Sequence, residues 1–401
     1  MNSFFASVEQ QVQPVLRGKP VCVAPYTGNT GCCIAKSYEA KSFGISTGHL
    51  VGDAKKICPQ IIVLESRPEL YMFYHREIVK VLEGLSPYVS IRSVDEFNIK
   101  LTGSDQKEKE AIKIANGFKK AIREKVGDYL SCSIGISANS WLAKLAGEQK
   151  KPDGLVLLAL DELPAFYDLL KLTDLPGINV AMERQLLNRN IKTPLEFFNQ
   201  SMVDLSLWFG HPGRVWYYRL RGFETDDYKS PTKSIGHQHV LAPKFRNKIA
   251  ARQVLSKMAQ KCSRRLRNKN LYTGAIGVCV SFLNAPSYHK SVSTGLIADG
   301  QTIQKLSLKL YDDYSGTNSP FRLAVTLYNL IQIKDKQISL FSDIEKSLQL
   351  SIAMDKINDQ FGDETIYPAS MLGSSDAVPN RIPFGDPGRL EFFDRNQQRV
   401  M

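Results

Sequence analysis

Apolar side chains recur along much of the chain at helical spacing. Between residues 105 and 126, Ile114, Phe118 and Ile122 follow one another at intervals of four residues, and charged residues fill the positions between them. This period is typical of an amphipathic helix whose apolar stripe faces a core. Shorter apolar runs, such as YLSCSIGI at 129–136, are typical of strands. The pattern therefore predicts both kinds of element.

Taken over the whole chain, these patterns predict a mixed α+β protein in several parts. Up to about residue 158, strands alternate with helices, which suits helices packed on one face of a sheet. From about residue 159 the pattern becomes helical with short loops, and after a polar linker a third unit combines a basic helix with several strands. We expect helices at 67–84, 105–126, 246–268, 300–314 and 344–361, and strands at 20–25, 129–136, 272–282, 287–293 and 321–331.

The helical part contains LPGIN at 175–179, which is similar to the tight turn of a helix-hairpin-helix. In such a turn, backbone N–H groups and a helix N-terminus can hold a phosphate of a nucleic-acid backbone. An ordinary Pro-Gly turn between two helices is the alternative.

Two neighbouring carboxylates interrupt the apolar stretch VSIRSVDEFNIKL at 89–101. In one continuous strand, alternate side chains face opposite sides, so Asp95 would lie on the apolar face with Ile91 and Phe97, and Glu96 would lie on the other. A buried ionised carboxylate must be paired or must bind a metal. The stretch is also much longer than the usual strand of about five or six residues, which favours two strands with a reversal at the acids.

Positive charge is concentrated in one part of the chain. The 52 Lys and Arg residues exceed the 40 Asp and Glu residues, for a formal net charge of +12, and no acid occurs between Tyr228 and Ala298. This balance favours a polyanionic partner such as nucleic acid over a membrane. Such a run can be a solvated face, but uncompensated bases repel one another, so we expect a phosphate-binding face. Its candidate residues are Arg246, Lys248, Arg264, Arg265, Arg267 and Lys269.

The remaining composition narrows the class of protein. The seven cysteines form no C-x-x-C pair and the six histidines are scattered, which argues against a zinc site or a disulfide framework. No apolar run of 18 residues and no signal peptide is evident. We therefore expect a cytoplasmic protein with reduced thiols and no membrane association.

Several motifs, in order and at matching spacing, resemble those of Y-family (DinB/UmuC-like) translesion DNA polymerases over residues 1 to about 341. They are NSFFASVEQ at 2–10, SYEAKSFGISTG at 37–48, SVDEF at 93–97, SIGISANSWLAKLAGEQKKPDG at 133–154, LPGI at 175–178, SIGH at 234–237 and QISLF at 337–341.

The resemblance implies an α+β multidomain fold, shaped as a right hand with an α/β little finger domain. We expect the following parts: palm at 1–10 and 67–158, fingers at 11–66, a helical thumb at 159–226, a linker at 227–233, the little finger at 234–333, and a C-terminal tail at 334–401 that carries a clamp-binding peptide.

The resemblance also implies a function for the paired carboxylates. In this family the matching Asp95 and Glu96 act on one catalytic magnesium site, so the chain must turn back between about Ser93 and Glu96. Two Mg²⁺ ions would neutralise the carboxylates, activate the primer 3′-hydroxyl and stabilise the leaving pyrophosphate. The carbonyl of Met1 matches the family's main-chain metal ligand.

One departure from the family pattern concerns the position before Met1. The pattern has a metal-binding aspartate there, whereas this chain begins at Met1, and Asn2 is an amide that cannot replace it. Two interpretations stay open: the sequence lacks a buried first strand of the palm, or the protein has lost catalysis. The presence of both Asp95 and Glu96 favours the first, since a degenerate site would have little reason to keep them.

Four further residues match nucleotide-binding positions of the family. Phe5 matches the aromatic steric gate that excludes a ribose 2′-hydroxyl; a core phenylalanine is the alternative. Tyr38, Lys41 and Lys151 match residues that bind the incoming triphosphate; a solvated helix face is the alternative for each. The family usually has Arg at position 41. Here the planar guanidinium, which can donate two parallel hydrogen bonds, is replaced by the single compact charge of a lysine ammonium.

QISLF, from Gln337 to Phe341, resembles the family's sliding-clamp-binding peptide. Gln337 would hydrogen-bond at the rim of a pocket on the clamp that Leu340 and Phe341 fill. Burial of these apolar residues against the protein's own surface is the alternative.

The sequence thus predicts a template-directed, Mg²⁺-dependent DNA polymerase of the lesion-bypass type that acts in DNA repair or damage tolerance. Its expected partners are primer–template DNA, deoxyribonucleoside triphosphates and a sliding clamp, and we expect a monomer. The rival interpretation is a catalytically inactive DNA-binding adaptor that docks on the clamp and recruits another polymerase.

Overall fold

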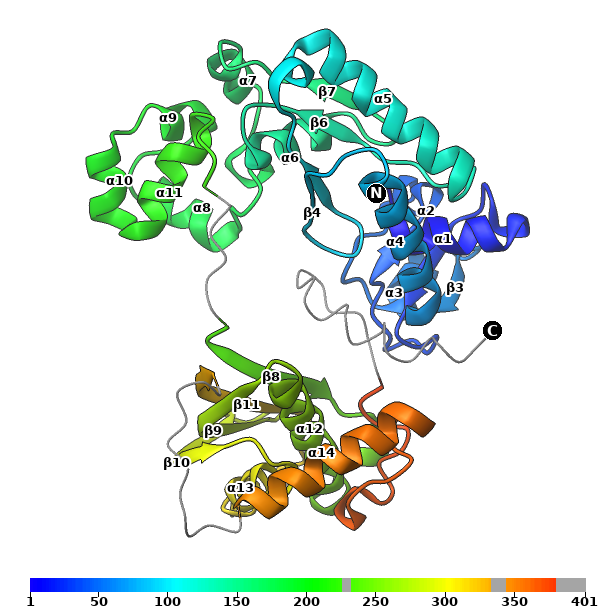
Figure 1. Ribbon diagram of the computed structural model, residues 1–401, viewed down its shortest axis with the longest axis vertical. Coiled ribbons are helices and arrows are strands. Elements are labelled where there is room, and N and C mark those ends of the chain that lie inside the picture. The colour runs from blue at the N-terminus through cyan, green and yellow to red at the C-terminus, as the bar shows by residue number, and fades with distance from the viewer. Residues whose placement is uncertain (226–231, 333–343, 380–401) are drawn as a thin grey trace. The chain divides into compact units, whose positions relative to one another are not determined.

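The structure is a computed structural model that describes residues 1–225, 232–332 and 344–379 (Figure 1). These residues form two compact units, one within residues 1–225 and the other within residues 232–379. None of the described helices is long and apolar enough to cross a membrane.

The first unit begins with a helix and a small three-stranded sheet. After α1 (Phe4–Val12), β1 (Val21–Ala24) pairs in parallel with β3 (Ile62–Glu65) and antiparallel with β2 (Ala35–Lys36). The short helices α2 (Tyr38–Ser42) and α3 (Val51–Ile57) follow β2. A small core fixes this part, with Cys22, Cys33, Ala40, Ile45, Ala54, Cys58 and Ile61 buried together. The predicted strand at 20–25 is confirmed.

The acidic stretch forms a hairpin rather than one strand. β4 (Val89–Ile91) pairs antiparallel with β5 (Phe97–Ile99), and Ile91 lies opposite Phe97. The backbone N–H groups of Arg92 and Ser93 both donate to the carbonyl of Glu96, at 2.9 and 3.1 Å. The predicted reversal at the acids is therefore confirmed, and it leaves both carboxylates at the end of the hairpin.

Two long helices and a second strand pair complete this half of the unit. The helices α4 (Pro68–Glu83) and α5 (Glu108–Lys125) lie where the four-residue spacing predicts them. β6 (Ile134–Ile136) pairs in parallel with β7 (Leu155–Leu157), and α6 (Ser140–Gln149) connects them (Figure 1). The predicted strand at 129–136 is thus shorter than expected. The carbonyl of Ser131 instead accepts from the backbone N–H of Asn2 at 2.9 Å, which holds this segment against the N-terminus.

The rest of the first unit is a helical bundle. It contains α7 (Leu163–Asp168), α8 (Val180–Leu187), α9 (Pro194–Phe198), α10 (Met202–Phe209) and α11 (His211–Leu220). Its core holds Trp141 and Trp216 edge to face, with ring centroids 5.5 Å apart.

The predicted turn at 175–179 leads into α8. Gly177 has a φ of +98°, a conformation that favours glycine. The side chain of Asn179 then caps the helix by accepting from the N–H of Met182 at 2.9 Å.

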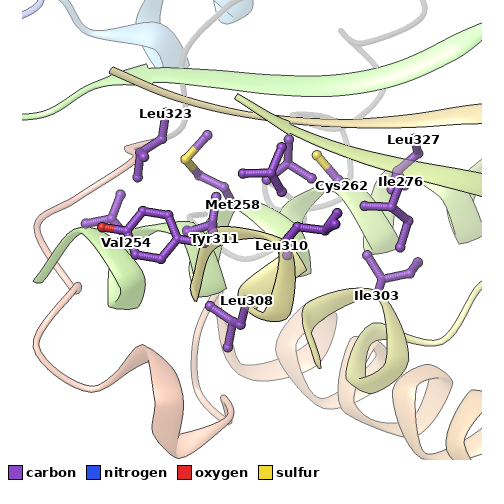
Figure 2. Close-up of a cluster of buried hydrophobic side chains, with 14 of the residues drawn as sticks. Val254, Met258, Cys262, Ile276, Ile303, Leu308, Leu310, Tyr311, Leu323 and Leu327 are labelled. Atoms are coloured by element: carbon purple, nitrogen blue, oxygen red, sulfur yellow. The ribbon is translucent and has the colours of Figure 1, made fainter. Parts of the chain in front are cut away.

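The second unit is a four-stranded antiparallel sheet covered on one face by helices. The strand order is β10 (Tyr288–Ile297), β9 (Leu271–Ser281), β11 (Arg322–Gln332), β8 (Ser234–Val240). Apolar side chains of β9 and β11 meet those of α12 (Lys248–Asn268) and α13 (Gly300–Asp312) in one core (Figure 2). The elements match the predicted ones to within a few residues.

The other face of the sheet carries the alternate residues of each strand. Leu323, Val325 and Leu327 are buried toward the helices, so Ala324 and Thr326 point to the opposite face. Their neighbours in register across the sheet, such as Gln238 and Cys279 beside Ala324, share that face. As expected from the pattern, the helices lie on one side only.

A further helix, α14 (Ile344–Phe361), packs on the helical layer as an outer element (Figure 1). Its existence and bounds match the prediction for 344–361, but the expectation of a separate tail does not hold for residues 344–379. Ala377 and Val378 are buried in the same core as the sheet, and Lys257 of α12 donates to the carbonyl of Ser375 at 2.9 Å. This segment is part of the second unit.

Candidate active site

A pocket in the first unit gathers residues from four separate parts of the chain. The start of α1, β2, the α2 region and the acidic hairpin all contribute to it, through Ser3, Phe4, Phe5, Ile34, Ala35, Lys36, Lys41, Thr47, Val94 and Asp95. Three of the predicted site residues, Phe5, Lys41 and Asp95, therefore lie around one pocket, although up to 90 positions separate them in the sequence.

The hairpin presents its two acids differently. Asp95 lines the pocket, and its Oδ1 accepts a hydrogen bond from the hydroxyl of Ser93 at 2.9 Å. Glu96 does not line the pocket; its Oε1 lies 2.6 Å from Nζ of Lys144 on α6, and both side chains are about half exposed. The lysine supplies a positive charge to the carboxylate of Glu96, a contact that the sequence did not indicate.

The two carboxylates are candidate ligands for a metal ion. Mg²⁺ usually binds to one or two protein carboxylates together with substrate phosphates and water, and Asp95 and Glu96 are oxygen ligands of that kind. Within the described ranges, no group of three or more His, Cys, Asp or Glu side chains could hold a metal by itself.

The N-terminal residues hold the hairpin and the neighbouring loops in place. The ammonium group of Met1 donates to the carbonyl of Asp95 at 2.5 Å. Asn2 is 2% exposed, and its amide donates to the hydroxyls of Tyr38 and Ser133 at 3.3 and 3.1 Å. The side chain of Asn2 therefore connects three segments of the unit. From the sequence, Asn2 was noted only as an amide that cannot replace the family's metal-binding aspartate.

Phe5 belongs to both the pocket and the core. It is 5% exposed, lines the pocket, and stacks on Tyr71 with ring centroids 4.3 Å apart. The hydroxyl of Tyr71 donates to Glu9 at 2.7 Å, and burial together with this bond raises the pKa of Tyr71. The ring of Phe5 is therefore held rigidly at the edge of the pocket, and both of its predicted roles are compatible with this position.

Tyr38, Lys41 and Lys151 lie near one another. The ammonium of Lys41 sits over the ring of Tyr38, 3.9 Å from its centroid. Burial, and then the nearby charges of Lys36 and Lys151, lower the pKa of Lys41. Lys151 is ion-paired with Glu148 at 2.7 Å. The geometry is that of a cationic patch beside the pocket, to which Lys36 belongs although no motif singled it out.

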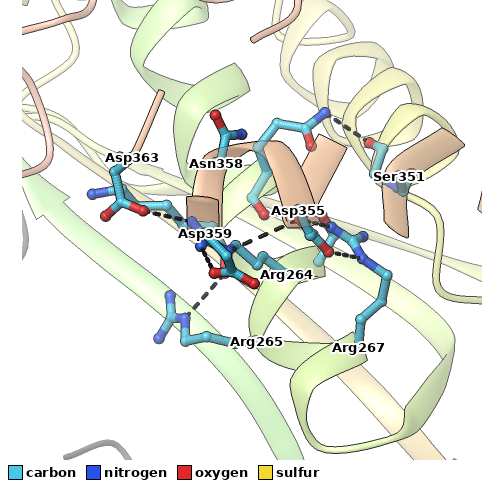
Figure 3. Close-up of polar contacts among 12 residues, drawn as sticks. Arg264, Arg265, Arg267, Ser351, Asp355, Asn358, Asp359 and Asp363 are labelled. Atoms are coloured by element: carbon cyan, nitrogen blue, oxygen red, sulfur yellow. Dashed lines mark hydrogen bonds and ion pairs between the residues drawn. The ribbon is translucent and has the colours of Figure 1, made fainter. Parts of the chain in front are cut away.

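Two of the expected DNA-binding arginines have partners within their own unit. Arg267 forms a bidentate pair with Asp355 of α14, at 2.6 and 2.9 Å (Figure 3). Arg264 lies 2.7 Å from Asp363 and 2.5 Å from Asp359. The two arginine side chains are only 8% and 14% exposed. They do not form a free phosphate-binding face, because acids about 90 residues later in the chain compensate them.

The other members of that set remain candidates. Arg265 donates to the carbonyl of Gly236 at 3.2 Å, and Arg246 donates to the carbonyl of Leu241 at 2.9 Å. Lys248 and Lys269 are exposed at the two ends of α12. All of them lie on the helical side of the sheet or at its rim, so the open sheet face is a separate surface. Gln337, Leu340 and Phe341 lie outside the described residues.

Comparison with known proteins assigns both units to one family. Residues 1–148 match the impB/mucB/samB family, and residues 232–340 match the C-terminal domain of the same family. The chain is 31% identical over 383 residues to DNA polymerase IV of Moorella thermoacetica, covering 92% of this chain and 94% of that protein. It is 29% identical over 392 residues to DNA polymerase IV of Pelotomaculum thermopropionicum, covering 95% and 96%.

Solved structures give the same fold. A Y-family DNA polymerase chimera of Dbh and Dpo4 superposes with a TM-score of 0.69 at 22% identity, over 82% of this chain and 97% of the other. An insertion ternary complex of Dbh DNA polymerase gives a TM-score of 0.54 at 22% identity, over 82% of this chain and 97% of that chain. With its catalytic-core and little-finger regions both matched, and with relatives that align over nearly its full length, the chain belongs to the impB/mucB/samB family of Y-family DNA polymerases.

Proposed function

We propose that this protein is a template-directed DNA polymerase of the lesion-bypass type, which adds deoxyribonucleotides to a primer in DNA repair or damage tolerance. The observation that supports this most strongly is the pocket that gathers Phe5, Lys41 and Asp95. An aromatic ring, a cation and a carboxylate around one pocket suit the sugar, the phosphates and the metal of an incoming nucleotide.

The test is extension of a labelled primer by the 401-residue protein with Mg²⁺ and all four deoxyribonucleoside triphosphates. Incorporation directed by the template supports the enzyme. A protein that binds primer–template and the sliding clamp, yet adds no nucleotide even when an upstream strand carrying the family's metal-binding aspartate is joined to Met1, would support the rival function of an inactive adaptor.

The chemistry follows from the residues around the pocket. Asp95 and Glu96 would hold Mg²⁺, which when bound activates the primer hydroxyl and stabilises the leaving pyrophosphate. Lys41 and Lys151 would bind the phosphates, and the ring of Tyr38 would hold the ammonium of Lys41 over its face. The carbonyl of Met1 would be a third metal ligand. In this arrangement catalysis is mainly positioning and charge stabilisation.

We propose that the first unit comprises the palm, fingers and thumb of a hand. We place the fingers around the β2-β1-β3 sheet at 11–66, the palm at 1–10 and 67–158, and the thumb at 159–226. The little finger covers 234–333, and residues 344–379 extend it. The protein is proposed to act as a monomer in the cytoplasm.

Phe5→Ala is expected to lower discrimination against ribonucleotides by about tenfold or more, because a clash with the 2′-hydroxyl is removed. It should also destabilise the first unit by about 3 kcal/mol, since the ring is buried against Tyr71. The measurement is the ratio of incorporation efficiencies for ribonucleotides and deoxyribonucleotides, together with a thermal melt.

Phe118→Ala is the matched control for this experiment. Phe118 on α5 is buried in the same core but does not line the pocket. It should lower the melting temperature and leave sugar discrimination unchanged. If both variants behaved alike, Phe5 would be a core residue only.

Replacing Leu340 and Phe341 with alanine is expected to weaken binding to the sliding clamp roughly several hundredfold. Each anchor at an interface hot spot is worth about 2 kcal/mol, and about 1.4 kcal/mol is tenfold in affinity. Clamp binding and thermal melting are measured on the same double variant. Intact binding, or a melt lowered by several degrees, would place these residues in the protein's own fold.

A further inference from the structure

Lys36 is a cation inside the candidate nucleotide pocket to which no motif assigns a role. It ends β2 and lines the pocket together with Lys41, Thr47 and Asp95. Its Nζ donates to the hydroxyl of Thr47 at 2.9 Å, and burial lowers its pKa. The neutral hydroxyl holds the ammonium in place and leaves its charge uncompensated.

Two neighbouring lysines, unlike Lys36, form ion pairs with carboxylates. Lys144 is paired with Glu96 and Lys151 with Glu148, at 2.6 and 2.7 Å. In the part of the chain that the structure describes, neither Lys36 nor Lys41 lies within 4.0 Å of a carboxylate oxygen. The two unpaired ammonium groups are therefore the ones that line the pocket.

The positive charges of Lys36 and Lys41 repel each other, so each makes it less favourable for the other to be charged in the pocket. The charge of Lys36 lowers the pKa of Lys41, in addition to the effect of burial. Two like charges in a partly buried pocket are unfavourable unless an anion joins them. The acid whose charge acts on Lys41 is Glu148, which already pairs with Lys151. The two ammonium groups that line the pocket thus outnumber its one carboxylate, Asp95, and a polyanion would compensate the excess positive charge.

We propose that Lys36 is a further nucleotide-binding residue, which contacts the phosphate chain of the incoming nucleotide beside Lys41. This inference rests on the proposed polymerase function. A triphosphate carries several negative charges along a chain, and two separate point charges can each bind one phosphate. Since position 41 is Lys rather than Arg, it lacks the planar bidentate fork, and Lys36 supplies a second positive charge at a separate point of the pocket.

The test measures nucleotide binding without chemistry. The 401-residue protein is bound to a primer–template whose primer ends in a dideoxynucleotide, and the Kd of the complementary deoxyribonucleoside triphosphate is measured with Mg²⁺, alongside that of the corresponding monophosphate. Lys36→Met keeps most of the side-chain volume and removes the charge. It is expected to weaken triphosphate binding by about tenfold, the value of one charge-assisted hydrogen bond, and monophosphate binding by less than about twofold.

Three further variants complete the experiment. Lys36→Arg is expected to restore triphosphate affinity to within about threefold of the parent, because the positive charge is kept. Lys41→Met tests the proposed site independently of Lys36. Lys55→Met removes an exposed lysine on α3 outside the pocket and should change neither affinity.

The outcomes separate this inference from the proposed function. If Lys41→Met weakened triphosphate binding and Lys36→Met did not, Lys36 would have no role and the nucleotide site would stand. Equal weakening of triphosphate and monophosphate binding by Lys36→Met would also overturn the phosphate contact. A parent protein that bound no triphosphate would remove both proposals.

Discussion

Asp95→Asn is expected to reduce primer extension by at least about 10³-fold, because a bound metal contributes several kcal/mol of charge stabilisation and about 1.4 kcal/mol corresponds to a tenfold rate. The amide keeps the shape of the side chain and can still accept from the hydroxyl of Ser93, which lies 2.9 Å from Oδ1. The fold and the affinity for primer–template should therefore be unchanged. Single-nucleotide incorporation, a melt and a DNA-binding titration measure these three quantities.

Asp105→Asn is the matched control. Asp105 is exposed in a short turn after the hairpin and does not line the pocket, so the same chemical change there should leave incorporation within about twofold of the parent. An Asp95→Asn protein with near-parental activity would show that the hairpin acid is not needed for catalysis, and would leave the proposed metal site without its central ligand.

The acidic hairpin shows which parts of the site could be predicted from the sequence. A thirteen-residue apolar stretch with two acids in its middle is too long for one ordinary strand, and local length alone favoured a reversal. Backbone bonds from Arg92 and Ser93 to Glu96 form that reversal. The signal was local, so it could be interpreted without knowing what the hairpin packs against.

The basic segment shows why other parts could not be predicted. The absence of acids between residues 228 and 298 describes only the neighbours of these bases in the sequence. It gives no information on acids from elsewhere in the chain that pack against them. Arg264 and Arg267 are instead compensated by Asp355, Asp359 and Asp363. The apolar spacing of residues 344–361 predicted a helix, but gave no information on which face of the protein it would cover.

Lys36 and Asn2 were missed for a related reason. Asn2 begins the motif at 2–10 and Lys36 directly precedes the motif at 37–48, but a motif gives no information on the contacts that a side chain makes across the fold. Asn2 reaches Tyr38 and Ser133, and Lys36 reaches Thr47. In each case the separation in sequence is more than ten residues, and neither residue type is unusual enough to be noticed alone.

Arg267→Ala is expected to destabilise the second unit by about 2–3 kcal/mol. Truncation leaves Asp355, whose side chain is 17% exposed, without its bidentate partner, and it also leaves the carbonyl of Ala298 without the 2.9 Å bond from Nη1. Breaking a fully buried pair costs about 3–5 kcal/mol; the smaller value allows for residual solvent and for Arg264, which lies 4.0 Å from Asp355. The melting temperature should fall by roughly 4–10 °C.

Arg252→Ala on the same helix is the matched control. It removes the same charge from an exposed ion pair, so the difference between the two variants measures the effect of burial. Arg252 forms a similar pair with Asp312 at 3.0 Å, but both side chains are 43% exposed, so its removal should cost less than about 1 kcal/mol. Below the melting temperature, Arg267→Ala should leave the salt dependence of DNA affinity unchanged, because its charge is already neutralised within the unit. A flattened salt dependence with an unchanged melt would reverse this assignment and return Arg267 to a phosphate-binding face, since each lost phosphate contact lowers the slope of log K against log salt by about 0.9.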